Sequence, residues 1–110
     1  MATAELEARV RRDGGSVAIE LEGDIDGRAE SALESAYAEV EATGSVLLDF
    51  SGVSYINSTG IALIVGLLAR ARRNGQTLSA RGLSQHYRQI FEITRLADFM
   101  TIVDDEEDSA

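Results

Sequence analysis

Residue types that carry much of enzyme chemistry are missing or nearly missing from this sequence. The 110 residues include no cysteine and no lysine, and His86 is the only histidine. Disulfides, thiolate zinc sites, cysteine nucleophiles, P-loop lysines and Schiff bases are therefore excluded. A single histidine leaves little for a hydrolytic triad or a multi-histidine metal site. We expect no catalytic residue, no metal site and no cofactor, and hence a protein that is not an enzyme.

Aromatic residues and positive charge are scarce as well. Aromatics make up 5% of the chain and hydrophobic residues 45%, so aliphatic side chains must build the core. The formal net charge of −9 disfavours direct binding of nucleic acid or anionic membrane, because both are polyanions. The longest apolar stretch, residues 61–69, is too short to span a bilayer, and residues 1–12 have no apolar core of the signal-peptide type. We expect a cytoplasmic protein.

The first half of the chain predicts a hairpin, a helix and a strand. Residues 6–12 and 17–21 alternate polar and apolar side chains on either side of turn residues 13–15, which is typical of a β-hairpin. Residues 23–27 break the second strand, and either Asp26 or Gly27 caps a helix over 28–42. The apolar run 46–50 predicts a strand buried on both faces, followed by a loop over 51–55.

The second half predicts two further helix–strand units. Asn57 or Ser58 caps a helix that ends near Asn74, and residues 77–80 form a strand. Ser84 caps a third helix before a last strand over 99–103, and its inward-facing residues are predicted to be Tyr87, Ile90, Phe91 and Ile93. The order ββαβαβαβ predicts a single α/β domain with a mixed four- to five-stranded sheet and helices packed on it. Its core covers residues 5–103, and residues 104–110 form an acidic tail too polar to pack.

The helix that follows Asn57 has no polar face for almost three turns. A stripe for packing on the sheet is predicted at Ile61, Ile64, Val65 and Leu68. The outer side, where a surface helix should be polar, carries Leu63, Gly66 and Leu67. This apolar outer side indicates either a docking surface for a partner or cover by a neighbouring helix.

A hydroxyl at the start of this helix suits phosphorylation. The simplest interpretation of Asn57 and Ser58 is an ordinary helix cap. A phosphate there would also be tolerated by the free N–H groups and the helix dipole, so modification need not unfold the domain. It would place about two negative charges beside an apolar contact surface, and the cost of burying that charge would lower the affinity for a bound partner.

Three segments resemble STAS domains of bacterial anti-sigma factor antagonists. The longest runs from residue 47 to 80 and reads LLDFSGVSYINSTGIALIVGLLARARRNGQTLSA. The others are LEGDIDG at 21–27 and IFEITRLADFMTIVDD at 90–105. The resemblance is in register over most of the chain, and implies a single STAS-like domain over residues 1–110.

The resemblance also implies a partner-switching function. An anti-sigma factor that is a serine kinase would phosphorylate Ser58, with Thr59 as the second choice. The unphosphorylated form would bind this kinase and free the sigma factor, and a metal-dependent serine phosphatase would reset it. The expected partner-binding residues are Asp24, Asp26, Asn57, Ser58, Thr59, Gly60, Leu63 and Leu67.

One position departs from the family pattern, because Asn57 replaces the usual Asp before the phosphorylated Ser. Slow or absent phosphorylation would follow if the kinase uses that carboxylate. Two alternatives are a constitutive, non-phosphorylated STAS binding module and a STAS subunit of a lipid-transport ABC system. Asp24 and Asp26 are interpreted first as turn and cap residues. Four arginines are interpreted first as a solvated face and second as contacts for an acidic partner, namely Arg70, Arg72, Arg73 and Arg81.

Overall fold

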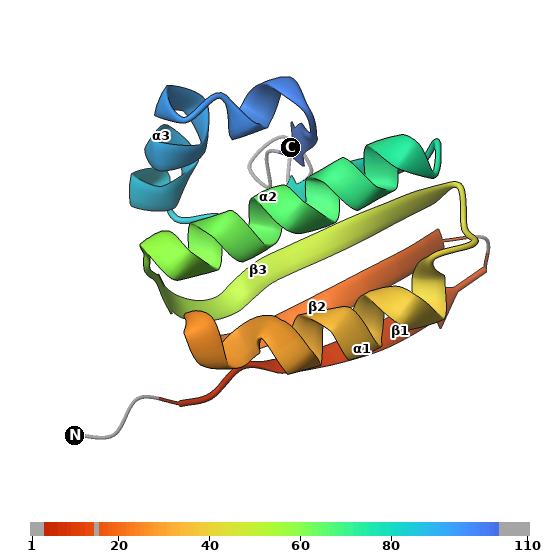
Figure 1. The fold of residues 1–110 in the computed structure, drawn as a ribbon, viewed down its shortest axis with the longest axis horizontal. Coiled ribbons are helices and arrows are strands. Elements are labelled where there is room, and N and C mark those ends of the chain that lie inside the picture. The colour runs from red at the N-terminus through yellow and green to blue at the C-terminus, as the bar shows by residue number, and fades with distance from the viewer. Residues whose placement is uncertain (1–3, 15, 104–110) are drawn as a thin grey trace.

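The computed structural model describes residues 4–14 and 16–103, which form a five-stranded sheet with α1 and α2 on one face (Figure 1). The strand order is β1-β2-β3-β4-β5, with β1 antiparallel to β2 and the remaining neighbours parallel. The elements are β1 (Glu7–Asp13), β2 (Ser16–Ile25), η1 (Gly27–Ala29), α1 (Glu30–Val40), β3 (Ser45–Ile56), α2 (Ser58–Arg73), β4 (Thr77–Arg81), α3 (Gln85–Ile93), η2 (Leu96–Asp98) and β5 (Thr101–Val103). The predicted α/β class and ββαβαβαβ order are confirmed, and the acidic tail over 104–110 lies outside the described residues.

Strands β2 and β3 are longer than the sequence predicts, because two expected breaks are irregularities within paired strands. The register passes from the pair Glu20–Asp49 to the pair Glu22–Gly52, so β3 carries one extra residue there. A second shift occurs between Gly23 and the next residue of β2. Such bulges bend and twist a pair of strands without ending it. The predicted loop at 51–55 is therefore wrong, because the pairing of β3 extends to Ile56. The break predicted at 23–27 begins only after Ile25, where β2 ends and Asp26 caps η1.

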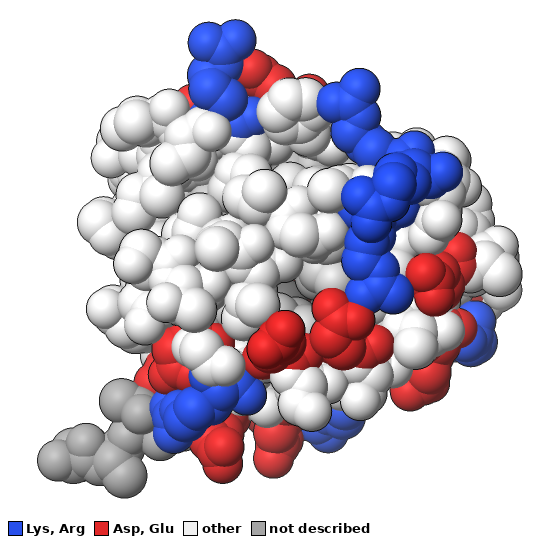
Figure 2. All heavy atoms as spheres, in the orientation of Figure 1, with Lys and Arg blue, Asp and Glu red and all other residues white. Residues whose placement is uncertain are grey.

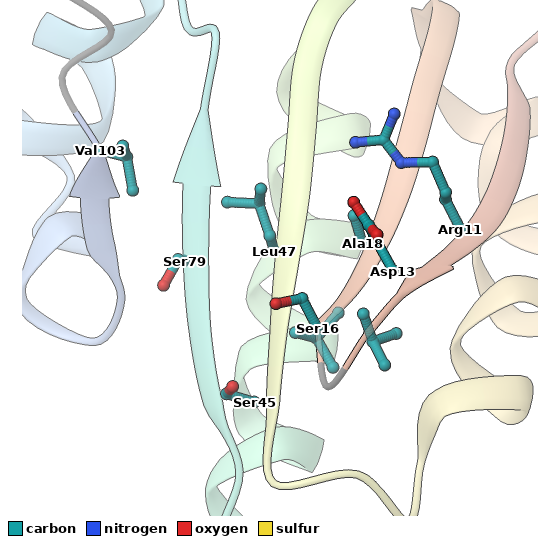
Figure 3. A pocket seen from close by; sticks show the side chains of 10 residues that line it. Arg11, Asp13, Ser16, Ala18, Ser45, Leu47, Ser79 and Val103 are labelled. Atoms are coloured by element: carbon teal, nitrogen blue, oxygen red, sulfur yellow. The ribbon is translucent and has the colours of Figure 1, made fainter. Parts of the chain in front are cut away.

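The middle of β3 is covered by helices on one face only, which corrects the prediction of a strand buried on both faces. Val46 and Leu48 are 2% exposed, whereas Leu47 and Asp49 alternate with them and are half-buried. Figure 3 views the sheet from the side away from α1 and α2, where Leu47 and Ala18 lie beside a hollow of about 270 Å³. This hollow lies near the amino ends of β2 and β3, whereas the helix-capping residues predicted for the site follow the carboxyl end of β3.

Helix α3 is held against β3 by a pair of aromatic rings and by a hydrogen bond to a tyrosine hydroxyl. The rings of Phe50 and Phe91 meet edge to face, with centroids 5.8 Å apart. The backbone N–H of Ile56 donates a hydrogen bond of 2.9 Å to the Tyr87 hydroxyl. The prediction that Ile93 faces inward is wrong, since it is 80% exposed. It lies two residues after the buried Phe91 and therefore on the opposite side of the helix.

A buried polar network joins the far end of α2 to α1 and β4. The Tyr37 hydroxyl donates to Gln76 Oε1 and accepts from Asn74 Nδ2 at 3.1 Å. Gln76 Nε2 donates to the carbonyls of Val40 at 2.9 Å and Thr43 at 2.7 Å. Tyr37 and Gln76 are buried, and buried polar groups are costly unless they are hydrogen-bonded. The network therefore fixes the carboxyl end of α2 on the sheet.

We expect Tyr37→Phe to lower the free energy of unfolding by about 1–2 kcal/mol, because it leaves the buried Gln76 carbonyl without its donor. Urea denaturation followed by circular dichroism measures the change. Tyr55→Phe is the matched control, since Tyr55 is 51% exposed and should lose little on the same substitution. Equal stabilities of the two variants would contradict the role assigned to the network.

Candidate functional site

Asn57 makes the turn that joins β3 to α2. Its Oδ1 accepts a hydrogen bond of 2.8 Å from the Gly60 N–H, so Asn57 rather than Ser58 is the N-cap. Its own backbone N–H donates to the Ile25 carbonyl at 3.2 Å. The first N–H groups of a helix have no acceptor within the helix, and this cap satisfies one of them. The two bonds fix the direction in which α2 leaves the end of β3.

Gly60 packs directly against the backbone of β2. A Cβ at this position would lie 2.0 Å from the Ile25 carbonyl oxygen, well inside van der Waals contact. Only glycine therefore allows the first turn of α2 to approach β2 this closely. Gly60 is buried, so we assign it a packing role in place of the direct partner contact expected from the sequence.

The position of Gly60 also sets which side of α2 faces the sheet. The buried residues of the helix are Gly60, Ile64, Leu67, Leu68 and Ala71. The prediction that Leu67 faces outward is wrong, because it is 3% exposed, and Leu63 is half-buried. Val65, predicted to face the sheet, is 45% exposed. Leu67 thus belongs to the core, and Val65 is an outer apolar residue that the sequence analysis missed.

Ser58 and Thr59 are exposed at the amino end of α2, as predicted for Ser58. The first turn contains no acidic residue, so the positive end of the helix dipole lacks a side-chain countercharge there. Figure 2 shows that the face over α3 and the amino-terminal half of α2 is a broad field without charged side chains. Tyr55, 51% exposed and close in sequence to Ser58, adds an aromatic side chain to this end of the molecule.

The turn after β2 lies beside this helix end. Asp24 is only 4% exposed, so its side chain contributes little to a contact surface. Asp26 caps η1 by accepting from the Arg28 N–H at 2.9 Å, and its Oδ2 pairs with Arg28 Nη2 at 2.9 Å. These hydrogen bonds from Arg28 hold the pKa of the Asp26 carboxyl below its usual value. A Cβ on Gly27 would lie 3.6 Å from Thr59 Cγ2, which places this turn against the start of α2.

His86 is exposed and packs edge to face against Tyr87, with ring centroids 4.9 Å apart. Over residues 4–14 and 16–103, no group of three His, Asp or Glu side chains could hold a metal ion. Within the same residues, no helix combines the length and apolar character needed to cross a membrane. Ser58 is thus an exposed hydroxyl at a helix start, beside a field without charged side chains.

Comparison with known proteins identifies the family. A profile described as "Mlab, STAS domain" matches residues 8–104, and the chain belongs to the STAS domain family. The anti-sigma-B factor antagonist of Staphylococcus epidermidis is 31% identical over 86 residues, which are 76% of this chain and 80% of that protein. The protein of the same name from Staphylococcus aureus strain NCTC 8325 is 30% identical over the same shares.

Solved structures share the fold. The anti-sigma factor antagonist SpoIIAA in its unphosphorylated form has a TM-score of 0.69 at 18% identity, covering 91% of this chain and 92% of that one. The phosphorylated form of the Bacillus cell fate determinant SpoIIAA has a TM-score of 0.67 at 19% identity, covering 91% and 94%. An anti-sigma factor antagonist from Mycobacterium paratuberculosis has a TM-score of 0.70 at 22% identity, covering 89% and 85%. At these identities the likeness establishes the fold.

Two glycines of α2 should respond in opposite ways to substitution by alanine. Gly60→Ala should lower the free energy of unfolding by about 3 kcal/mol, because the new Cβ overlaps the Ile25 carbonyl. Gly66→Ala should raise stability by about 0.5–1 kcal/mol, because its Cβ would meet nothing within 4 Å and alanine is the better helix former. Thermal unfolding of both variants measures the difference, and a mild effect at Gly60 would refute the close approach described above.

Proposed function

We propose that this chain is a non-catalytic anti-sigma factor antagonist that is switched by phosphorylation. In its unmodified form it binds an anti-sigma factor that is also a serine kinase, and thereby releases the sigma factor. Phosphorylation of Ser58, with Thr59 as the second choice, ends the complex. A metal-dependent serine phosphatase restores the unmodified form. The names of the staphylococcal relatives support the first step, since both are called anti-sigma-B factor antagonists.

The exposed Ser58 at the start of α2 is the observation that carries this proposal. Ser58 is the first residue of the helix, so a phosphate on its hydroxyl would meet unpaired N–H groups and the positive end of the helix dipole. The fold should therefore survive modification. The surrounding surface is uncharged (Figure 2), so a partner complementary to it would present few charged groups that could pair with a phosphate. A related fold, that of SpoIIAA, has been solved in a phosphorylated form, which fits this view.

The partner surface is assigned to exposed and half-buried residues. Ser58, Thr59 and the half-buried Asn57 form its centre, and Val65 extends it along the outer side of α2. Asp26 borders it through the turn that packs on Thr59. Leu63 contributes its exposed part, whereas the buried Asp24, Gly60 and Leu67 support this surface from within.

Ser58→Asp should weaken binding to the purified anti-sigma factor kinase at least tenfold, and Ser58→Ala should bind like the parent but resist phosphorylation. A carboxylate at the helix start gains about 0.3–1 kcal/mol from the dipole, so the domain stays folded. Burying the same charge under a partner costs about 2–5 kcal/mol, and each 1.4 kcal/mol is a tenfold change in affinity. Isothermal titration of each variant against the kinase measures the dissociation constant.

Ser45→Asp is the control, because Ser45 is also exposed but begins β3 at the other end of the sheet. It should bind like the parent. Unchanged affinity of Ser58→Asp would remove Ser58 from the interface. Phosphate found by mass spectrometry on Thr59 alone would move the switch to that hydroxyl. A complex that forms without phosphate ever appearing on either residue would favour the constitutive binding module.

Asn57→Asp should raise the initial rate of Ser58 phosphorylation severalfold if the kinase orients its substrate through a carboxylate at this position. The substitution keeps the cap, because Asp also accepts the hydrogen bond from the Gly60 N–H. Asn57→Ala is the control that removes the cap, and it should cost about 1 kcal/mol of stability without raising the rate. Phosphate incorporation at equal occupancy of the kinase measures the effect. Equal rates for the parent and Asn57→Asp would mean that the kinase accepts the neutral amide.

A second candidate is a STAS subunit of a lipid-transport ABC system. The description of the matching family names Mlab and no anti-sigma factor antagonist, so family membership alone does not select the partner. The same exposed end of α2 would then dock on a transporter. Affinity purification from cytosol and from detergent-solubilised membranes separates the two candidates. Recovery of a permease and its ATPase at fixed stoichiometry would favour the transport subunit. Recovery of a kinase that also inhibits a sigma factor would favour the antagonist.

A further inference from the structure

Two exposed arginines end α2 at the opposite end from Ser58. The chain carries 19 acidic and 10 basic residues, so an arginine without a carboxylate partner is unexpected. Arg70 is paired with Glu34 and Glu41 of α1. Arg72 and Arg73 form no ion pair with any residue in the part of the chain that the structure describes. Figure 2 shows the resulting band of basic side chains over this end of the helix, next to the uncharged field.

Arg72 is held in place by an aromatic ring. Its guanidinium lies over the Phe99 ring, 5.1 Å from the centroid, and Phe99 is itself 51% exposed. Stacking of this kind leaves the N–H groups at the edge of the guanidinium free to donate hydrogen bonds to a planar carboxylate. The contact therefore orients a charged group at the surface before any partner arrives, which reduces the entropy lost on binding.

A depression of about 480 Å³ adjoins this stacked pair, between the end of α2 and the start of β5. Its lining residues are Arg72, Gln76, Thr77, Leu78, Asp98, Phe99, Met100 and Thr101. One acidic group, Asp98, faces the depression, and its Oδ2 is paired with Arg95 Nε at 2.6 Å. The lining thus combines a guanidinium, threonine hydroxyls and apolar side chains. The depression is large enough to receive one side chain of a ligand.

We propose that Arg72, Arg73 and Phe99, together with this depression, form a second docking surface for an acidic segment of a partner protein. Carboxylates of the segment pair with the two arginines, and one apolar side chain enters the depression against Phe99. A short acidic segment fits better than nucleic acid or anionic membrane, because the net charge of −9 repels extended polyanions. Arg72 and Arg73 lie about 21–22 Å from Ser58 along the axis of α2, at 1.5 Å per residue. A ligand bound here would therefore make no direct contact with Ser58.

Titration of the ¹⁵N-labelled full chain tests the proposal. The probe is a twelve-residue peptide with four Asp or Glu residues around one Phe, and the control peptide carries Asn and Gln in their place. We expect shift changes in residues 72–77 and 98–101, a dissociation constant that rises with salt, and no such changes with the control peptide. The double variant Arg72→Gln, Arg73→Gln should bind about tenfold more weakly, and Phe99→Ala should also bind more weakly.

Arg9→Gln is the matched control variant, because Arg9 of β1 is an exposed arginine paired with Glu22 of β2, and its substitution should not affect binding. The proposal is overturned if the acidic peptide does not bind at millimolar concentration, if shifts appear elsewhere, or if the double variant binds like the parent. Duplex DNA and anionic phospholipid vesicles form separate arms of the titration. Tighter binding of either at residues 72–77 would replace the acidic protein segment as the occupant.

Discussion

The first turn of α2 lies against the end of β2, where Gly60 approaches the Ile25 carbonyl more closely than any side chain would permit. Asn57 holds the same junction from the other direction, with its backbone N–H on that carbonyl and its side chain on the Gly60 N–H. Because one side of this turn must face β2, the residues between Asn57 and Gly60 must face solvent. The exposure of Ser58 and Thr59 is thus a consequence of backbone packing beneath them.

The same contact explains where periodicity alone failed on α2. In an almost continuous apolar run, hydrophobic periodicity cannot select which residues face the sheet, because Val65 and Leu67 are equally plausible as buried residues. A glycine one turn into a helix is a separate signal, since it costs helix stability unless a close approach requires it. Taking Gly60 as inward-facing would have selected the observed positions Ile64, Leu67 and Ala71, at spacings of three and four residues.

The fold class and element order could be predicted because they depend on alternation and capping signals that act locally. Asn57 and Ser84 begin helices as those signals indicate. Strand ends could not be predicted as well, since glycine and serine mark both loops and bulges. Gly23 and Gly52 look like breaks, yet each lies in a paired strand, and a Cβ would come within 3.0 Å of a neighbouring backbone oxygen at either position. Only the partner strand distinguishes a bulge from a loop.

The amino end of α2 also separates the stability of the fold from the strength of a contact made over it. A phosphate on Ser58 would meet unpaired N–H groups and no acidic neighbour in the first turn, so the isolated domain has little to lose. A partner that covers the same position must bury the charge. Asn57 sharpens this contrast, because a neutral cap leaves the unmodified site uncharged, whereas Asp would give it a negative charge before any phosphate arrived. The charge of Asp26 is compensated by Arg28, so a phosphate on Ser58 would be the main uncompensated charge at this end of the helix. On modification this end of the helix would then change from nearly neutral to anionic, by the charge of about −1.5 to −2 that a phosphate carries.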